Sequence, residues 1–157
     1  MSSVRKIDAD KIHILSIRTL KGNIDASSEA NTDKIASHQF NFELATGLNP
    51  TEKVVGLQLL VNINAVDKDD KPLSIRGSYT HEMLFHVDNL DEFIETSESG
   101  NVIDAGLGST LISIIYSTVR GIICTRTQGT SLGLVVLPVI DPRKLMGLAE
   151  KEEVKAE

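Results

Sequence analysis

The stretch GLGSTLISIIYSTVRGIICTRTQGTSLGLVVLP, which runs from Gly106 to Pro138, decides how this chain folds. Its first two thirds place apolar residues at near-helical spacing. These residues are Leu107, Leu111, Ile115, Val119, Ile122 and Ile123. The β-branched content would also suit a strand, but the length and the glycine-bearing start at 106–110 favour a helix that ends at Gln128-Gly129. More apolar residues lie between the stripe positions, so the helix needs cover on several sides, which predicts self-association.

The residues after this helix predict an extended segment and a second, short helix. Leu132–Val139 is apolar and reads as a strand-like cover. Asp141-Pro142 then starts a short helix, with Asp as its N-cap and Pro at its first position. The segment 150–157 is charged, and we expect it to be a disordered tail outside a single domain of residues 1–149.

Strand patterns dominate the part of the chain that precedes the helix. Ile12–Leu20 is a predicted first strand, and Phe40–Leu44 alternates apolar and polar residues. Two longer alternating segments, Leu57–Ala65 and Leu73–Val87, are joined by the polar turn 67–72 and predict an antiparallel pair with one buried face. Between them and the helix, 89–93 predicts a helical turn and 97–101 a loop, while 22–37 predicts a long polar connection.

Composition and charge exclude several classes of protein. The 157 residues carry a net charge of −6 without a Lys/Arg cluster, which argues against a nucleic-acid partner. A single cysteine permits no intramolecular disulfide, and the first residues lack a secretory apolar run, so we expect a cytoplasmic protein. The uncharged run Ala105–Val119 is shorter than the ~20 apolar residues of a membrane span and contains hydroxyl side chains, so no membrane insertion is expected.

No residue pattern predicts an enzyme, a cofactor or a metal. His81 and His86 are one residue too far apart for the H-E-x-x-H zinc motif. The glycines at 106 and 108 lack the lysine of a phosphate-binding loop and the third glycine of a dinucleotide turn. Cys124 lies within the apolar helix without a paired histidine nearby in the sequence, which favours a structural role.

The order of these segments resembles the SecB-like export chaperones. The similarity rests on Thr127-Gln128-Gly129-Thr130, Leu134–Val139, Leu145-Met146, Phe40–Leu44 and Leu84–Val87. It implies an α+β fold in which a four-stranded antiparallel sheet is followed by one long and one short helix packed on one face. It also implies an ATP-independent holdase that binds unfolded preproteins for export, as a homotetramer built from two dimers.

The resemblance further implies the residues of two surfaces. The client-binding positions are Phe40, Phe42, Leu44, Leu145 and Met146. The long helices would pack between sheets of different subunits, which places Leu111, Ser113, Ile115, Ser117 and Val119 at an oligomer interface.

One departure and two alternatives qualify the export function. SecB proteins dock on the translocation ATPase SecA partly through acidic residues on the sheet, whereas Ile75-Arg76-Gly77-Ser78 contains no acid. Holdase action is therefore better supported than delivery to SecA. A SecB-like chaperone dedicated to one partner, such as an antitoxin, is the first alternative. The second is a thioesterase of the hotdog fold, although that fold places its long helix early, between strands.

Overall fold

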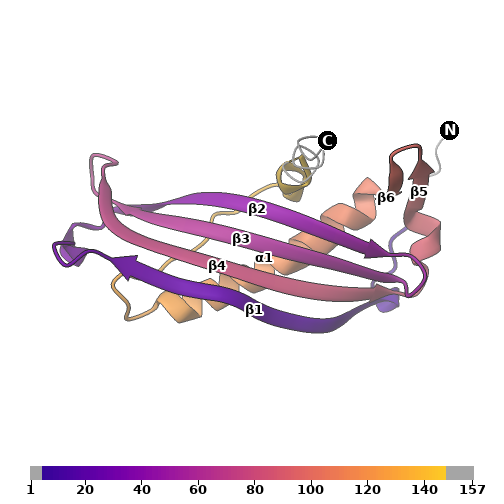
Figure 1. Ribbon diagram of the computed structural model, residues 1–157, viewed down its shortest axis with the longest axis horizontal. Coiled ribbons are helices and arrows are strands. Elements are labelled where there is room, and N and C mark those ends of the chain that lie inside the picture. Colours follow the sequence, from indigo (N-terminus) through magenta and orange to yellow (C-terminus); the bar gives the residue numbers. More distant parts are fainter. Residues whose placement is uncertain (1–4, 148–157) are drawn as a thin grey trace.

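A four-stranded antiparallel sheet with a long helix across one face forms the body of the protein (Figure 1). This computed structural model describes residues 5–147. The strands are β1 (Ile12–Ala26), β2 (Ser37–Asn49), β3 (Val54–Val66) and β4 (Pro72–Val87), in the spatial order β1-β4-β3-β2. The helix α1 (Ala105–Thr127) follows them, and a short helix occupies 142–147. The predicted fold class is confirmed.

The central strands β3 and β4 carry the alternation that the sequence predicts. The residues of β3 that face α1 are almost fully buried. They are Leu57, Leu59, Val61, Ile63 and Ala65, each 0–2% exposed. On β4 the same face holds Ile75, Tyr79, Met83, Phe85 and Val87. Because these apolar side chains recur at every second position, burying them requires a layer on that face only.

Several elements differ from the prediction. β1 continues to Ala26, six residues beyond the predicted end at Leu20, and pairs with β4 through two register shifts, at Ile14/Ser16 and Thr19/Lys21. The predicted loop at 97–101 is a small hairpin of β5 (Ile94–Ser97) and β6 (Gly100–Ile103). Short 3-10 helices occupy η1 (Ala9–Lys11), η2 (Thr32–Lys34) and η3 (Leu90–Phe93), the last of them confirming the predicted helical turn.

The chain itself covers more of α1 than the sequence suggested. Asp104 caps the helix by accepting hydrogen bonds from the Gly106 and Leu107 N–H groups. The sheet then buries one side of the helix, and the segment that follows α1 lies along another side, where Pro138 O accepts a hydrogen bond from the Tyr116 hydroxyl. A partner subunit is therefore not needed to bury most of the apolar residues of α1.

The extended segment after α1 lies against the sheet without pairing as a strand in the described part of the chain. Leu132, Val135 and Leu137 are buried, and Leu134 and Val136 between them are exposed. Thr127 Oγ1 anchors the segment by accepting the Val135 N–H at 3.0 Å. The predicted tail 150–157 and the domain boundary at 149 lie outside the described residues.

By length and composition alone, α1 could cross a membrane. The core helix of a water-soluble protein can have the same length and hydropathy. Two features of α1 fit that explanation: it carries arginines at 120 and 126, and it contributes residues to the core. Eight residues of α1 are buried inside the protein, most of them against the sheet.

Candidate client-binding groove

A groove of about 270 Å³ opens beside the C-terminal end of β2. Its floor is formed by core residues of β2, β3 and α1, among them Leu44, Leu57 and Leu111. Val102 of strand β6, which is 52% exposed, and Met146 of the short helix also line it. Five separate elements thus converge on one apolar depression at the surface.

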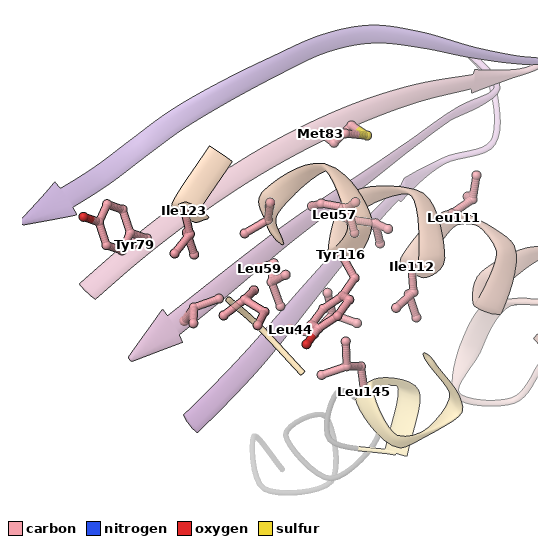
Figure 2. Packing of buried hydrophobic residues seen from close by; sticks show 14 of the residues in the cluster. Leu44, Leu57, Leu59, Tyr79, Met83, Leu111, Ile112, Tyr116, Ile123 and Leu145 are labelled. Carbon is pink, nitrogen blue, oxygen red and sulfur yellow. The ribbon is translucent and has the colours of Figure 1, made fainter. Parts of the chain in front are cut away.

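The structure separates the five predicted client-binding residues into two groups. Leu44 and Met146 line the groove. Phe40 and Phe42 do not: both are half-buried, their rings stack 6.0 Å apart, and Phe42 meets the ring of Tyr116 edge-on at 5.7 Å. Leu145 is 2% exposed and packs into the core beside Leu44 and Tyr116 (Figure 2). Their role as client contacts stays a prediction, and only the first group lines the groove.

The predicted interface residues separate in the same way. Leu111, Ile115 and Val119 are at most 1% exposed because the sheet of the same chain covers them. Ser113 and Ser117 lie on the opposite, exposed side of α1. An interface through α1 stays a prediction, but its contact face would have to be the side of the two serines, since the three apolar residues already pack inside the subunit.

Several groove residues were missed by sequence reasoning. Val102 and Ile103 lie in β6, just past the predicted loop 97–101, and Thr46 and Leu48 lie past the predicted end of the strand at Leu44. A signal for the hairpin does exist: β-branched residues flank a Ser-Gly step, and Gly100 has a φ of +116°. The hairpin is fixed at the start of α1, because the Asp104 N–H donates to Phe93 O at 2.7 Å.

Among residues 5–147 no charged residue lines the groove, so this part of the chain favours apolar ligand groups there. Thr46 and Asn101 supply its few polar side-chain atoms. Tyr116 does not line the groove; burial raises its pKa, and its ring centroid lies 5.2 Å from the Arg120 guanidinium. Glycine at 108 matters to the shape of the groove, because a Cβ there would come within 3.2 Å of Met146 Cε.

No cluster of His, Cys, Asp or Glu able to hold a metal ion occurs in residues 5–147. His81 is 1% exposed and lies on the buried face of β4, between Tyr79 and Met83. Burial there lowers its pKa. His86 instead contacts Asp88 on the surface, so the two histidines are far from a common site. Cys124 is only partly buried, within α1.

The strand order and the helix that follows the strands give this chain a SecB-like fold. The chain is similar over this fold to the Mycobacterium tuberculosis SecB-like chaperone Rv1957, solved in complex with a ChAD peptide from the HigA1 antitoxin Rv1956. The TM-score is 0.61 at 15% sequence identity, and the match covers 84% of this chain and 92% of that one. This finding confirms the resemblance at the level of the fold.

A second similar structure is a protein of unknown function from Streptococcus agalactiae. It has a TM-score of 0.45 at 11% identity and covers 82% of this chain and 97% of that one. No protein-family model matches the sequence. No curated protein matches it either. The hotdog alternative does not fit the topology, because α1 follows all four strands of the main sheet.

Proposed function

We propose that this protein is an ATP-independent holdase that binds an unfolded apolar segment of a client protein in the groove beside β2. The observation that carries the proposal is the uncharged, apolar depression formed by Leu44, Leu48, Val102 and Met146 on a SecB-like fold. A holdase needs no reacting groups. It needs exposed apolar surface that is held open, and removing client surface from water there is favourable by about 25 cal/mol per Å².

A dedicated client, such as an antitoxin, is better supported than general export. The similar chaperone from Mycobacterium tuberculosis was solved with an antitoxin peptide. In addition, the sheet position that would carry acidic docking residues for SecA holds Arg76 between the buried Ile75 and Gly77. We therefore infer a cytoplasmic chaperone for one partner or a few partners, with preprotein export as the alternative outcome.

The proposed assembly is a homo-oligomer that pairs through β1. Four of the exposed large apolar residues of the described chain gather on this edge strand. They are Ile14, Leu15, Ile17 and Leu20, each 45–55% exposed. Helix α1 crosses the sheet diagonally and leaves the first half of β1 uncovered (Figure 1). Exposed apolar patches of this kind mark interaction sites.

Charges on β1 favour a second copy as the partner. Two β1 strands in antiparallel register over their full length would place His13 of one copy opposite Asp25 of the other, and Arg18 opposite Leu20. No like charges would face each other in that register. Pairing would occupy the β1 edge of each copy, which gives a closed assembly with two-fold symmetry.

Suppression of aggregation tests the holdase function. Wild-type protein at a stoichiometric ratio should keep an unfolded apolar precursor soluble without ATP, measured by light scattering. Val102→Asp should lose most of this protection, because it places a charge at the groove wall. At 52% exposure, Val102 can be changed without unfolding the chain.

The matched control is Val139→Asp, which makes the same change at a valine that is 89% exposed and does not line the groove. It should protect the precursor as the wild type does. A wild type that fails to protect any precursor would remove the holdase proposal. Equal protection by Val102→Asp and Val139→Asp would remove the groove assignment. An antitoxin-type client bound far more tightly than preproteins would separate the dedicated role from general export.

A further inference from the structure

Strand β2 is an edge of the sheet, and its outer side has no backbone partner in the described part of the chain. It pairs with β3 without interruption from Ser37↔Val66 to Asn49↔Val54. Its thirteen residues include no proline, lysine or arginine. Edge strands of stable proteins usually carry bulges, lysines or prolines that prevent pairing with other chains. β2 lacks these devices, so its edge remains able to accept a further strand.

The groove lies directly beside this edge. Leu44, Thr46 and Leu48 point to the helix side of β2 and line the groove, while their neighbours Ala45 and Gly47 point to the other face. A strand added along this part of β2 would turn every second side chain toward the groove. Since a dry cavity of about 150 Å³ accepts a benzene ring, a groove of about 270 Å³ has room for one large apolar side chain.

The charge on β2 affects which strands could pair favourably with its edge. Glu43 is exposed at the middle of Ser37–Asn49, and it is the only charged residue of β2. If two copies of β2 paired antiparallel over their full length, Glu43 would face Glu43 of the other copy, because 43 is the midpoint of 37 and 49. Like charges directly opposite each other destabilise a pair of strands. The edge is therefore unfavourable for self-pairing and favourable for a strand with a neutral or basic residue at that position.

We propose that the client binds as a fifth strand along the outer edge of β2, with an apolar side chain in the groove and a neutral or basic residue opposite Glu43. The proposal rests on the holdase function above and specifies its ligand class. The ligand is an extended segment with apolar residues at alternate positions and without an acidic residue at the centre. Backbone hydrogen bonds would supply affinity that does not depend on sequence, and the groove and Glu43 would supply selection.

Backbone methylation of a probe peptide tests the strand addition. The probe is an octapeptide of alternating valine and threonine with one central lysine and a fluorophore at its N-terminus, and the full chain is titrated into it while fluorescence anisotropy is recorded. Single N-methyl groups placed along the peptide should weaken binding about tenfold at every second position, where the N–H donates to β2, and little at the positions between. Weakening that shows no period of two, or a probe that does not bind a protein active in aggregation suppression, would overturn strand addition and leave the holdase function standing.

Charge reversal tests the role of Glu43. Wild-type protein should bind the lysine probe about two- to fivefold more tightly than the same peptide with a central glutamate. Glu43→Lys should invert this preference. Glu29→Lys, the same change in an exposed loop away from β2, should keep the wild-type preference. Equal affinities for both probes in the wild type, or an inversion by Glu29→Lys, would overturn the assignment to Glu43.

Discussion

The two edges of the sheet, β1 and β2, differ in nearly every property that controls pairing. β1 carries four exposed large apolar residues, two register shifts and the cations Arg18 and Lys21. β2 is regular, has one charge, and places its apolar residues on the helix side, where the short helix and Tyr116 meet them. One edge thus exposes apolar side chains around an irregular backbone, whereas the other exposes an unbroken backbone beside an apolar groove.

This difference suggests that the two edges take different partners. An irregular edge with a fixed set of side chains suits one specified partner, because bulges and charges exclude other strands. A regular edge suits an extended client, since its backbone can bond to the strand while the groove and Glu43 select its side chains. We therefore assign β1 to assembly with a second copy and β2 to clients, and the following experiments are ordered from the largest expected effect to the smallest.

The largest effect is expected from a charge placed on β1. Leu15→Lys should convert the oligomer into a species of lower mass in sedimentation velocity, because it puts an unpaired charge in a buried contact. Leu134→Lys is the matched control, since both leucines are 55% exposed and Leu134 lies on the segment after α1. A wild-type protein that sediments as a monomer would refute the assembly, and equal masses for both variants would move the interface away from β1.

An intermediate effect is expected from the anchor of the segment that covers the β2 side. Thr127 is fully buried, and its hydroxyl donates to Ile123 O at 2.8 Å while accepting the Val135 N–H. Thr127→Val leaves that N–H without a partner, which should lower the free energy of unfolding by about 1–3 kcal/mol. Thr127→Ser keeps the hydroxyl and should lose less. Chemical denaturation measures both, and a valine variant as stable as the wild type would contradict the anchoring role.

The smallest effect concerns pH and His81, which is paired with Thr19 of β1 across the sheet. Burial, with the charge of Arg126 second, lowers the pKa of His81 below 6.5. The unfolded chain therefore binds more protons, so this contribution to stability is complete above pH 6.5 and decreases as the pH falls through the lower, folded value. His81→Leu should make the free energy of unfolding depend less on pH in the acid range, by up to about 1.4 kcal/mol per pH unit. Unchanged slopes in denaturation series from pH 7 to 5 would show that His81 is already solvated in the native state.

Much of the fold could be predicted because the signals are periodic and local. Alternation at Leu57–Ala65 and Leu73–Val87 marks two strands with one buried face, and the 3.6-residue repeat marks α1. The hairpin Ile94–Ile103 was missed because its strands have four residues each, too few to show a period. The end of β1 was missed because an edge strand outside the core needs no apolar alternation.

The sites were less predictable than the fold. The resemblance to SecB implies that Phe40 and Phe42 are groove residues, but which aromatic residues remain open depends on Tyr116, more than seventy positions away. Likewise, Leu111, Ile115 and Val119 could face a partner or the sheet with the same helical spacing. Only the position of the sheet relative to α1 decides between these two, and spacing within one helix carries no information about that position.

Hydrogen exchange of backbone amides, followed by mass spectrometry with and without a bound client segment, tests the division between the two edges most directly. The account predicts that amides of Ile12–Ala26 are already protected in the free oligomer and do not change. It predicts that amides of Ser37–Asn49 exchange faster when free and become protected when the client binds. Client-induced protection at β1, or a client that binds without protecting β2, would contradict it.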